Sequence, residues 1–488
     1  MLSGKPLLYT MTMLNALSFL LIGYVRGVMG GVSGTPGFLK TFNLNPKIDH
    51  DNTMLGTIVA TYELGCFAGS ILCSLIGERI GRRYSILLGT IIMIGGTAFQ
   101  SAVSTQAAMI GARIVAGLGM GFINSTAPVL QAEISPSATR GRYVCFQLSL
   151  LNLGIMLAYW VGYGFSLGND DYLWRIPVAL QAVFQIPMVI LCLIIPESPR
   201  WLAAHDKKDE CLQVIARLKG RSNEDAEVRS QFNDILDAVA LEKSIGSGRW
   251  RDLLREDEIK SRRRLLIACS IQFFQQAGGI NALIYYGGTF LTAAGLDAHT
   301  AALISGVMFT WFFVASFIPW FLIDTVGRRK LLLVCISLMA VCFCLEAGLV
   351  YKVDTTHSKA AGGAATAFLF VYLGLFTIGF QAVVWVYPSE ILPLRLRQKG
   401  SSISTACNWI TNYAVVQITP IALKKIHYKF YIVFAVINAA FLPPIYFFYP
   451  ETKGMNLEDV DRLFAGNNVR AFEHDAESKH TDTQVQEA

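Results

Sequence analysis

Apolar residues along the chain gather into twelve runs, each bounded by charged residues or by clusters of proline and glycine. A run of about 20 apolar residues has the length that spans a bilayer as an α-helix. Six runs precede a charged stretch from Glu197 to Arg264, and six follow it. The pattern predicts transmembrane helices near residues 9–30, 54–76, 84–104, 107–131, 141–164, 174–195, 265–292, 301–324, 330–351, 363–387, 399–423 and 428–449.

Three short motifs occur once in each half of the chain, in the same order. They are an acid followed by Gly-Arg-Arg, an acid and an arginine seven residues apart, and Pro-Glu before a hydroxyl residue. The two copies are separated by 246, 257 and 254 residues, a nearly constant offset that indicates internal repetition. We therefore expect an all-α membrane protein of twelve transmembrane helices in two six-helix lobes related by the repeat. The predicted parts are lobes at 1–196 and 265–450, a cytoplasmic helical linker at 197–264 and a cytoplasmic tail at 451–488.

The repeated motifs place acids and bases at helix ends where one lobe faces the other. Such charges can pair across the interface when that side of the protein is shut and separate when it opens, at roughly 1 kcal/mol per pair. The alternative is that arginine-rich turns only fix the topology. The predicted cytoplasmic gate consists of Glu78, Arg82, Arg83, Glu133, Arg140, Asp324, Arg328, Arg329, Glu390 and Arg397.

Charge and composition narrow the class of protein. Basic residues fall on alternate connections between the runs, which predicts that these connections and both termini are cytoplasmic. The net charge of +6 therefore reports membrane orientation and gives no support for nucleic-acid binding. The cysteines are scattered singly, and the sequence has no metal-ligand spacing, catalytic grouping or phosphate-binding loop, so we expect no enzyme, no metal and no cofactor.

One predicted span, residues 265–292, carries amide and phenol groups within an otherwise apolar segment. A carboxamide in hydrocarbon is unfavourable unless it faces other helices, a wet cavity or a ligand. The adjacent Gly278 and Gly279 allow the backbone to unwind, so that amides on both sides of them can face one cavity. Uncharged groups of this kind suit a ligand rich in hydroxyls; the alternative is that they hold helices together. The polar residues of this span are Gln275, Gln276, Asn281, Tyr285 and Tyr286.

Several motifs together cover nearly the whole chain. They are Gly77-Glu-Arg-Ile-Gly-Arg-Arg83, Gly111-Ala-Arg113, Pro196-Glu-Ser-Pro-Arg200, Gln275-Gln276, Pro388-Ser-Glu390 and Pro450-Glu-Thr-Lys453. This set resembles the sugar porter family of the major facilitator superfamily, and residues 61–69 and 408–412 resemble its fungal branch of hexose, pentose, polyol and sugar-acid carriers. The resemblance implies a multi-pass carrier in the lipid bilayer, in the plasma membrane, that moves a monosaccharide or polyol by alternating access, facilitated or coupled to protons.

The resemblance also implies a sugar site near the middle of the membrane. Indole rings suit this role because their faces pack against the C–H surface of a sugar ring. In the fifth span, many relatives place a sugar-binding glutamine where this chain has Ile155, which leaves Gln147 and Asn152 as substitutes. The substrate-binding residues implied by the resemblance are Gln275, Gln276, Asn281, Trp385, Asn408 and Trp409, to which the polar stretch above adds Tyr286.

The first span departs from the family pattern. Proton-coupled members carry an acid after Gly-Tyr, paired with the arginine that matches Arg113, whereas this chain has Val25-Arg26. An unpaired arginine at the bilayer centre costs at least about 2.5 kcal/mol, so a partner is expected. The chain is a facilitator, or Glu63 takes over pairing and coupling, or Arg26 binds the carboxylate of a sugar acid or cyclic acid such as a uronate or quinate. Arg26 can also simply pack at the lobe interface or reach toward the membrane surface.

Two other functions fit the sequence less well. A drug carrier of the same superfamily is disfavoured, because the fifth predicted span, 141–164, contains no proline. A non-transporting sugar sensor would tolerate an altered coupling site, but known sensors have long cytoplasmic tails, and only about 35 residues follow Lys453 here.

Overall fold

The computed structural model describes residues 3–45, 48–134, 140–168, 170–245, 253–254, 260–393, 396–453, 455, 460 and 463–464. All the regular secondary structure in these residues is helical. The first half contains α1 (Lys5–Val32), α2 (Pro36–Thr41), α3 (Asp49–Ile80), α4 (Arg82–Ala102), α5 (Gln106–Ile134), α6 (Arg140–Ser166), α7 (Arg175–Ala179) and α8 (Ala182–Ile194).

Three helices lie between the halves: α9 (Pro199–Ala204), α10 (Lys208–Lys219) and α11 (Ala226–Ile245). The second half contains α12 (Ser261–Ala277), α13 (Ile280–Ala293), α14 (Ala298–Ala315), α15 (Pro319–Val326), α16 (Arg328–Thr356), α17 (Lys359–Phe376), the π-helical turn η3 (Thr377–Gln381), α18 (Ala382–Ile391), α19 (Arg397–Ile426) and α20 (Lys429–Phe448). With α7–α8, α12–α13, α14–α15 and α17–η3–α18 each counted as one interrupted span, the described residues form twelve spans.

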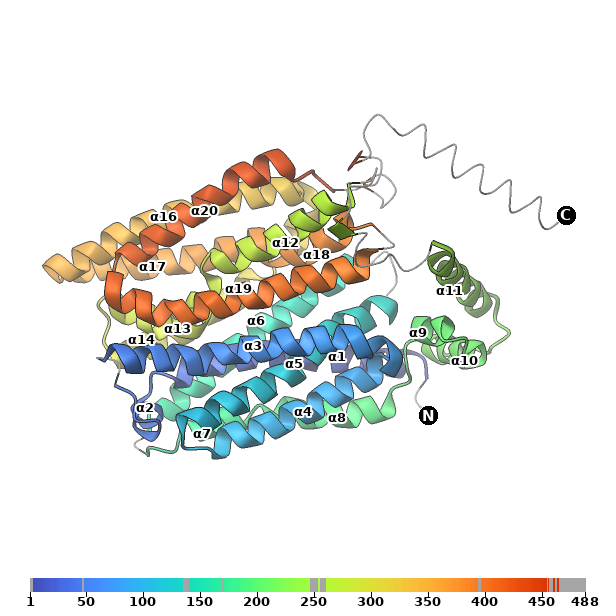
Figure 1. Cartoon of the computed structure of the whole chain (residues 1–488), viewed down its shortest axis with the longest axis horizontal. Coiled ribbons are helices and arrows are strands. Elements are labelled where there is room, and N and C mark those ends of the chain that lie inside the picture. The colour runs from blue at the N-terminus through green and yellow to red at the C-terminus, as the bar shows by residue number, and fades with distance from the viewer. Residues whose placement is uncertain are drawn as a thin grey trace.

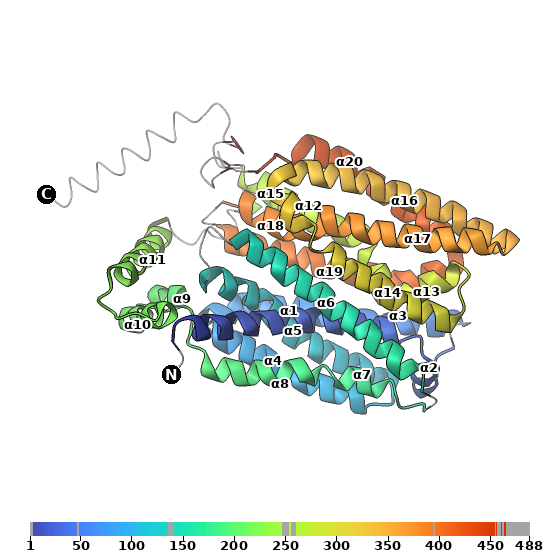
Figure 2. The ribbon, with the colours of Figure 1, turned by 180° about the vertical axis from the view of Figure 1, so that it is seen from behind.

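The two halves lie side by side as two bundles, with α3 beside α19 and α6 beside α14 along the seam (Figures 1 and 2). Helices α9, α10 and α11 lie at one end of the bundle, close to the start of α1 (Figure 1). We call this the linker end and the opposite end the distal end. The predicted all-α, twelve-helix, two-lobe fold is confirmed.

Close packing within the first lobe depends on glycines that face a neighbouring backbone. A Cβ added to Gly23 of α1 would lie 1.8 Å from the carbonyl oxygen of Leu151 in α6, and one added to Gly117 of α5 would lie 2.2 Å from that of Tyr62 in α3. Small residues let helices approach closely where lipid offers no hydrophobic driving force for association. These contacts hold α1 against α6 and α3 against α5, and so fix the two helices that carry Arg26 and Glu63.

Ten helices of the described residues are long and apolar enough to cross a membrane. Neither α12–α13 nor α19 is among them. The first of these spans is divided into two pieces of 17 and 14 residues. The second carries a dense set of polar residues on its buried side, including Ser404, Asn408 and Asn412. These two spans pack against each other in the second lobe.

Candidate functional site

The seventh span is broken where the two glycines predict it. Helix α12 ends at Ala277, α13 begins at Ile280, and Gly279 between them has φ +100°. L-residues with a side chain rarely adopt that conformation, so glycine permits the break. Tyr372 donates its hydroxyl hydrogen to the carbonyl of Gly278 at 2.9 Å, and the side-chain amide of Asn438 donates to the same oxygen at 3.2 Å. A carbonyl released from the helix is thereby satisfied, and the predicted broken helix is confirmed.

Side-chain amides on both sides of the break bond to one another and to α19. Gln276 donates to Asn408 at 3.0 Å and accepts from Asn281 at 2.5 Å. Asn408 donates to Gln275 at 3.0 Å and to Gln272 at 2.7 Å. All five side chains are buried. The structure therefore brings Gln275, Gln276, Asn281 and Asn408 into one network, which we call the amide cluster together with Gln272.

The remaining predicted binding residues lie on the same elements or beside them. Tyr286 donates to the carbonyl of Val416 in α19 at 3.2 Å. Trp409 follows Asn408 and is fully buried, and Trp385 of α18 is half-buried. Within the described residues, the indole Nε1 of Trp409 and the Oδ1 of Asn281 have no hydrogen-bond partner. Buried polar atoms of this kind are free to bond a solute.

Three charged residues meet where the lobes touch. Glu63 of α3 is fully buried and accepts a hydrogen bond from the Tyr285 hydroxyl of α13 at 2.5 Å. The guanidinium groups of Arg26 and Arg113 act on this carboxylate at longer range, without a direct ion pair in the described part of the chain. Arg26 also lies over the ring of Trp409, 5.2 Å from its centroid. We call Arg26, Glu63 and Arg113 the charge cluster; it joins α1, α3 and α5 of the first lobe to α13 and α19 of the second.

Two further polar contacts involve residues outside the predicted site. Gln272 belongs to the amide cluster, and its spacing of three and four residues from Gln275 and Gln276 on one helix face was a signal in the sequence. Asn152 of α6 and Gln381 of η3 bond each other reciprocally across the lobe interface. The sequence offers Asn152 as a substitute for position 155, whereas no sequence pattern points to its partner Gln381.

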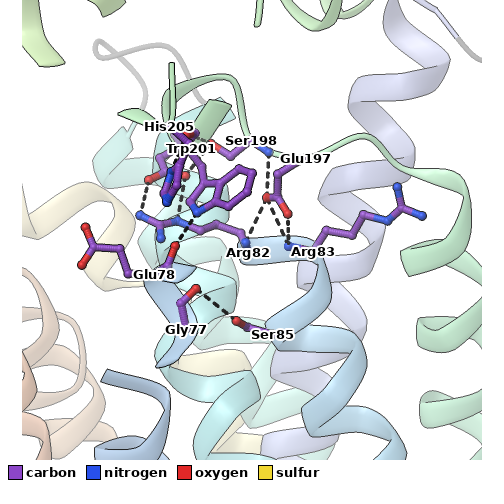
Figure 3. Close-up of polar contacts among 10 residues, drawn as sticks. Gly77, Glu78, Arg82, Arg83, Ser85, Glu197, Ser198, Trp201 and His205 are labelled. Atoms are coloured by element: carbon purple, nitrogen blue, oxygen red, sulfur yellow. Dashed lines mark hydrogen bonds and ion pairs between the residues drawn. The ribbon is translucent and has the colours of Figure 1, made fainter. Parts of the chain in front are cut away.

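At the linker end, Glu197 binds the start of α4 (Figure 3). Gly81, with φ +99°, precedes this helix and has no side chain with which to cap it. The carboxylate of Glu197 accepts from the backbone N–H groups of Arg82 and Arg83 at 2.9–3.2 Å and from that of Ser198 at 2.8 Å. Burial raises the pKa of Glu197, while these N–H donors act in the opposite direction. The acid of the Pro-Glu motif therefore caps a helix about 115 residues before it in the chain.

The second lobe repeats this arrangement. Gly327, with φ +99°, precedes α16, and Glu451 accepts from the backbone N–H groups of Arg328 and Arg329 at 2.8 and 3.1 Å. In both lobes the first arginine binds the acid of the middle motif at 3.0 Å: Arg82 binds Glu133, and Arg328 binds Glu390. The repeat seen in the sequence is thus a repeat of hydrogen bonds, each set lying within one lobe.

The sequence predicted that these acids and arginines pair across the two lobes as a cytoplasmic gate. In the described part of the chain, the bonds of Arg82 to Glu133 and of Arg328 to Glu390 stay within a lobe. Arg83 donates to the carbonyls of Cys192 and Leu193, and the side chain of Glu78 is exposed. The side chains of Arg140, Asp324 and Arg397 lie outside the described residues, so pairing across the lobes stays a prediction.

Comparison with known proteins agrees with this geometry. The family model described as "Sugar (and other) transporter" matches residues 11–464. The chain belongs to the sugar transporter family. It is 39% identical over 471 residues to the MFS-type transporter oryC of Aspergillus oryzae. That alignment covers 96% of this chain and 87% of that protein. It is 36% identical over 478 residues to the sugar transporter STL1 of Saccharomyces cerevisiae, with 95% of this chain and 82% of that protein covered.

Solved structures of this family share the fold. The xylose transporter XylE from E. coli, in a partially occluded inward open conformation, superposes with a TM-score of 0.77 at 21% identity, covering 93% of this chain and 100% of XylE. At that identity the likeness concerns the fold alone. Family membership makes this chain a multi-pass membrane transporter of the major facilitator superfamily, and its relatives are transporters rather than enzymes.

Proposed function

We propose that this transporter carries a neutral monosaccharide or polyol by alternating access, and that it works as a facilitator without proton coupling. Relatives with names that state a substrate support the class of solute. The chain is 31% identical over 481 residues to the high-affinity glucose transporter of Kluyveromyces lactis, covering 94% of this chain. The substrate-binding residues proposed are those predicted from the sequence, with Gln272 added.

The amide cluster is the observation that carries the proposal. Each carboxamide offers two donors and one oxygen acceptor, and sugar hydroxyls both donate and accept. The cluster joins α12, α13 and α19, so a solute that exchanges hydrogen bonds with it pulls on both pieces of the broken span. Uncharged partners of this kind bind hydroxyls without the desolvation cost of an ion.

The charge cluster argues against a sugar acid as the substrate. Arg26 already has the carboxylate of Glu63 nearby and the face of Trp409 beneath it. A cation over an indole is stabilised by roughly 0.5–2 kcal/mol, depending on how well it is desolvated. Because Arg26 is compensated by the protein, it does not require an anionic substrate. This leaves the reading in which Glu63 takes over the pairing.

The same cluster argues for facilitated transport. Two guanidinium groups and one carboxylate leave a net positive charge inside the bundle. Protonating Glu63 would leave both cations uncompensated, and each uncompensated arginine is costly at membrane depth. The two arginines therefore oppose proton uptake at the acid, whereas burial of its carboxylate favours it. A facilitator needs no such step.

We also propose that the linker end is cytoplasmic and the protein resides in the plasma membrane. The arginines of both helix-cap sites and of the start of α12 lie at that end, as expected of cytoplasmic loops. The proposal includes the cytoplasmic gate and the domain limits predicted from the sequence, which are 1–196, 197–264, 265–450 and 451–488. The orientation can be tested in intact cells with a thiol reagent that does not cross the membrane. Of two variants, one with a single cysteine placed in α10 and one with a single cysteine placed in α2, only the α2 variant should react.

Uptake by reconstituted vesicles tests the function. D-glucose, D-xylose, glycerol and D-galacturonate are supplied at several pH values, with and without a protonophore. We expect equilibrative uptake of at least one neutral solute, unaffected by the protonophore, and an apparent KM raised about tenfold by Gln276→Ala. Gln185→Ala is the matched control, because Gln185 is an equally buried amide that binds Thr97 within the first lobe.

Three results would contradict the proposal. Uptake of galacturonate alone, abolished by Arg26→Gln, would make the substrate a sugar acid. Collapse of neutral uptake with the protonophore would make the carrier proton-coupled and Glu63 the first residue to neutralise. Binding of a sugar without any uptake would make the protein a sensor.

A further inference from the structure

A second pair of buried amides, not hydrogen-bonded to the amide cluster in the described residues, lies at the lobe interface. Asn152 of α6 is fully buried, and Gln381 of η3 is 6% exposed. Asn152 donates to Gln381 at 2.9 Å, and Gln381 donates back to Asn152 at 2.6 Å. Asn152 also donates to the carbonyl of Phe312 at 3.3 Å. Each carboxamide therefore presents a donor and an acceptor side by side to the other lobe.

The backbone places Gln381 beside a predicted sugar-stacking residue. Gln381 closes the π-helical turn Thr377–Gln381, and Trp385 follows it by four residues in α18. Residues four apart share a helix face, so the amide and the indole project toward the same side. A π-helical turn inside an α-helical span is rare and occurs frequently at functional sites.

In the first lobe, the residue that reaches Gln381 is Asn152 and not Ile155. Ile155 is fully buried and lies on the side of α6 that packs against α1, where a Cβ added to Gly27 would be 2.9 Å from its carbonyl oxygen. Asn152, almost one turn earlier, turns to α14 and η3 instead. The first lobe therefore brings an amide to the interface from a different position of the same helix.

We propose that Asn152 and Gln381 form a specificity-determining pair that contacts the substrate from both lobes. A reciprocal amide pair matches two neighbouring hydroxyls of a sugar or polyol, because both offer one donor and one acceptor at each of two adjacent groups. The solute exchanges its hydroxyls for the bonds between the two amides, so the buried polar atoms keep their partners. This inference rests on the proposed function and supplies the first-lobe contact for it.

The test pairs each side chain with each hydroxyl of the solute. Inhibition of D-glucose uptake by D-glucose, 2-deoxy-D-glucose, 3-deoxy-D-glucose and 6-deoxy-D-glucose is measured in vesicles for the wild type, Asn152→Ala, Gln381→Ala and the Gln185→Ala control. In the wild type, removal of a contacted hydroxyl is expected to weaken inhibition about threefold to tenfold. In the variant that lacks its partner, removal of the same hydroxyl is expected to have no further effect. The control should behave as the wild type.

Folding is monitored independently, by size exclusion and thermal unfolding in detergent. If either alanine variant does not fold, Asn152→Ser and Gln381→Asn are used, because both keep a polar group and are expected to change the hydroxyl preference. Equal effects of every deoxy analogue in the wild type and in both pair variants would overturn the inference while leaving sugar transport intact. A wild type that carries none of D-glucose, D-xylose and glycerol would instead overturn the proposed function.

Discussion

The charge cluster yields a prediction about stability that depends on charge balance. Glu63 is the acid that acts on both Arg26 and Arg113, and it is fully buried. Glu63→Gln keeps the shape and an acceptor for the Tyr285 hydroxyl but removes the negative charge. Leaving a buried charge without its partner costs about 3–5 kcal/mol. We expect the lower end, about 3 kcal/mol, because Arg26 retains the face of Trp409 and a small exposed fraction.

The measurement is thermal unfolding of the purified transporter in detergent, for Glu63→Gln, Arg26→Gln and the double variant. The double variant restores the original net charge and is expected to recover most of the stability lost in Glu63→Gln. A matched control is Glu346→Gln. Glu346 of α16 is also buried, but in the described residues neither of its carboxylate oxygens has a hydrogen-bond partner. Its neutralisation should leave stability unchanged or improve it.

Two outcomes would refute this reasoning. Unfolding of Glu63→Gln at the wild-type temperature would show that the carboxylate is not compensating the arginines. A double variant less stable than both single variants would show that the two residues contribute through packing or separate hydrogen bonds, and the argument against proton uptake would lose its basis.

Four other substitutions test the remaining parts of the structure. Gly279→Ala should lower the unfolding temperature, with a cost of roughly 1–3 kcal/mol, because Gly279 has φ +100° and a new Cβ would lie 3.0 Å from the ring of Phe434; an unchanged temperature would contradict the observed break. Glu451→Gln should weaken the cap of α16 by roughly 0.5–2 kcal/mol, and Glu197→Gln should weaken that of α4 by a similar amount, both measured by thermal unfolding; a large effect in one lobe only would argue against equivalent roles. Trp409→Phe should preserve folding but raise the KM for sugar uptake, because a ring is retained under Arg26 while the smaller phenyl group lacks the unpartnered indole N–H and part of the indole surface; unchanged KM would exclude this N–H as a substrate donor.

Features that depend on local sequence could be predicted. The twelve spans follow from the length of apolar runs, and the break in the seventh span follows from adjacent glycines within it. The two-lobe repeat follows from short motifs at a nearly constant offset. The apolar runs and the glycine pair are local signals, the repeat comes from comparing motifs along the chain, and the structure confirms the fold and the break.

Contacts between lobes could not be predicted in the same way. Asn152 and Gln381 are 229 residues apart, and Glu63 and Tyr285 are 222 apart. Each pairing depends on the rotation of two helices about their axes, and that of Gln381 depends also on the π-helical turn that it closes. Glu197 and Glu451 were recognised as parts of a repeat, but their role as caps for α4 and α16 required the fold, because Gly81 and Gly327 adopt positive φ before helices distant in sequence.

The two spans that build the candidate site, α12–α13 and α19, are broken or interspersed with polar residues. Amides within a membrane are retained only where they have partners, and the amides of α12, α13 and α19 find those partners in one another. A more apolar α12 or α19 would insert more favourably but would have nothing to exchange with a hydroxylated solute. The hydrogen bonds that stabilise these spans are the same bonds that a sugar must replace, so their strength limits the affinity for the sugar. A substitution that strengthens an amide–amide bond within the cluster should therefore weaken sugar binding.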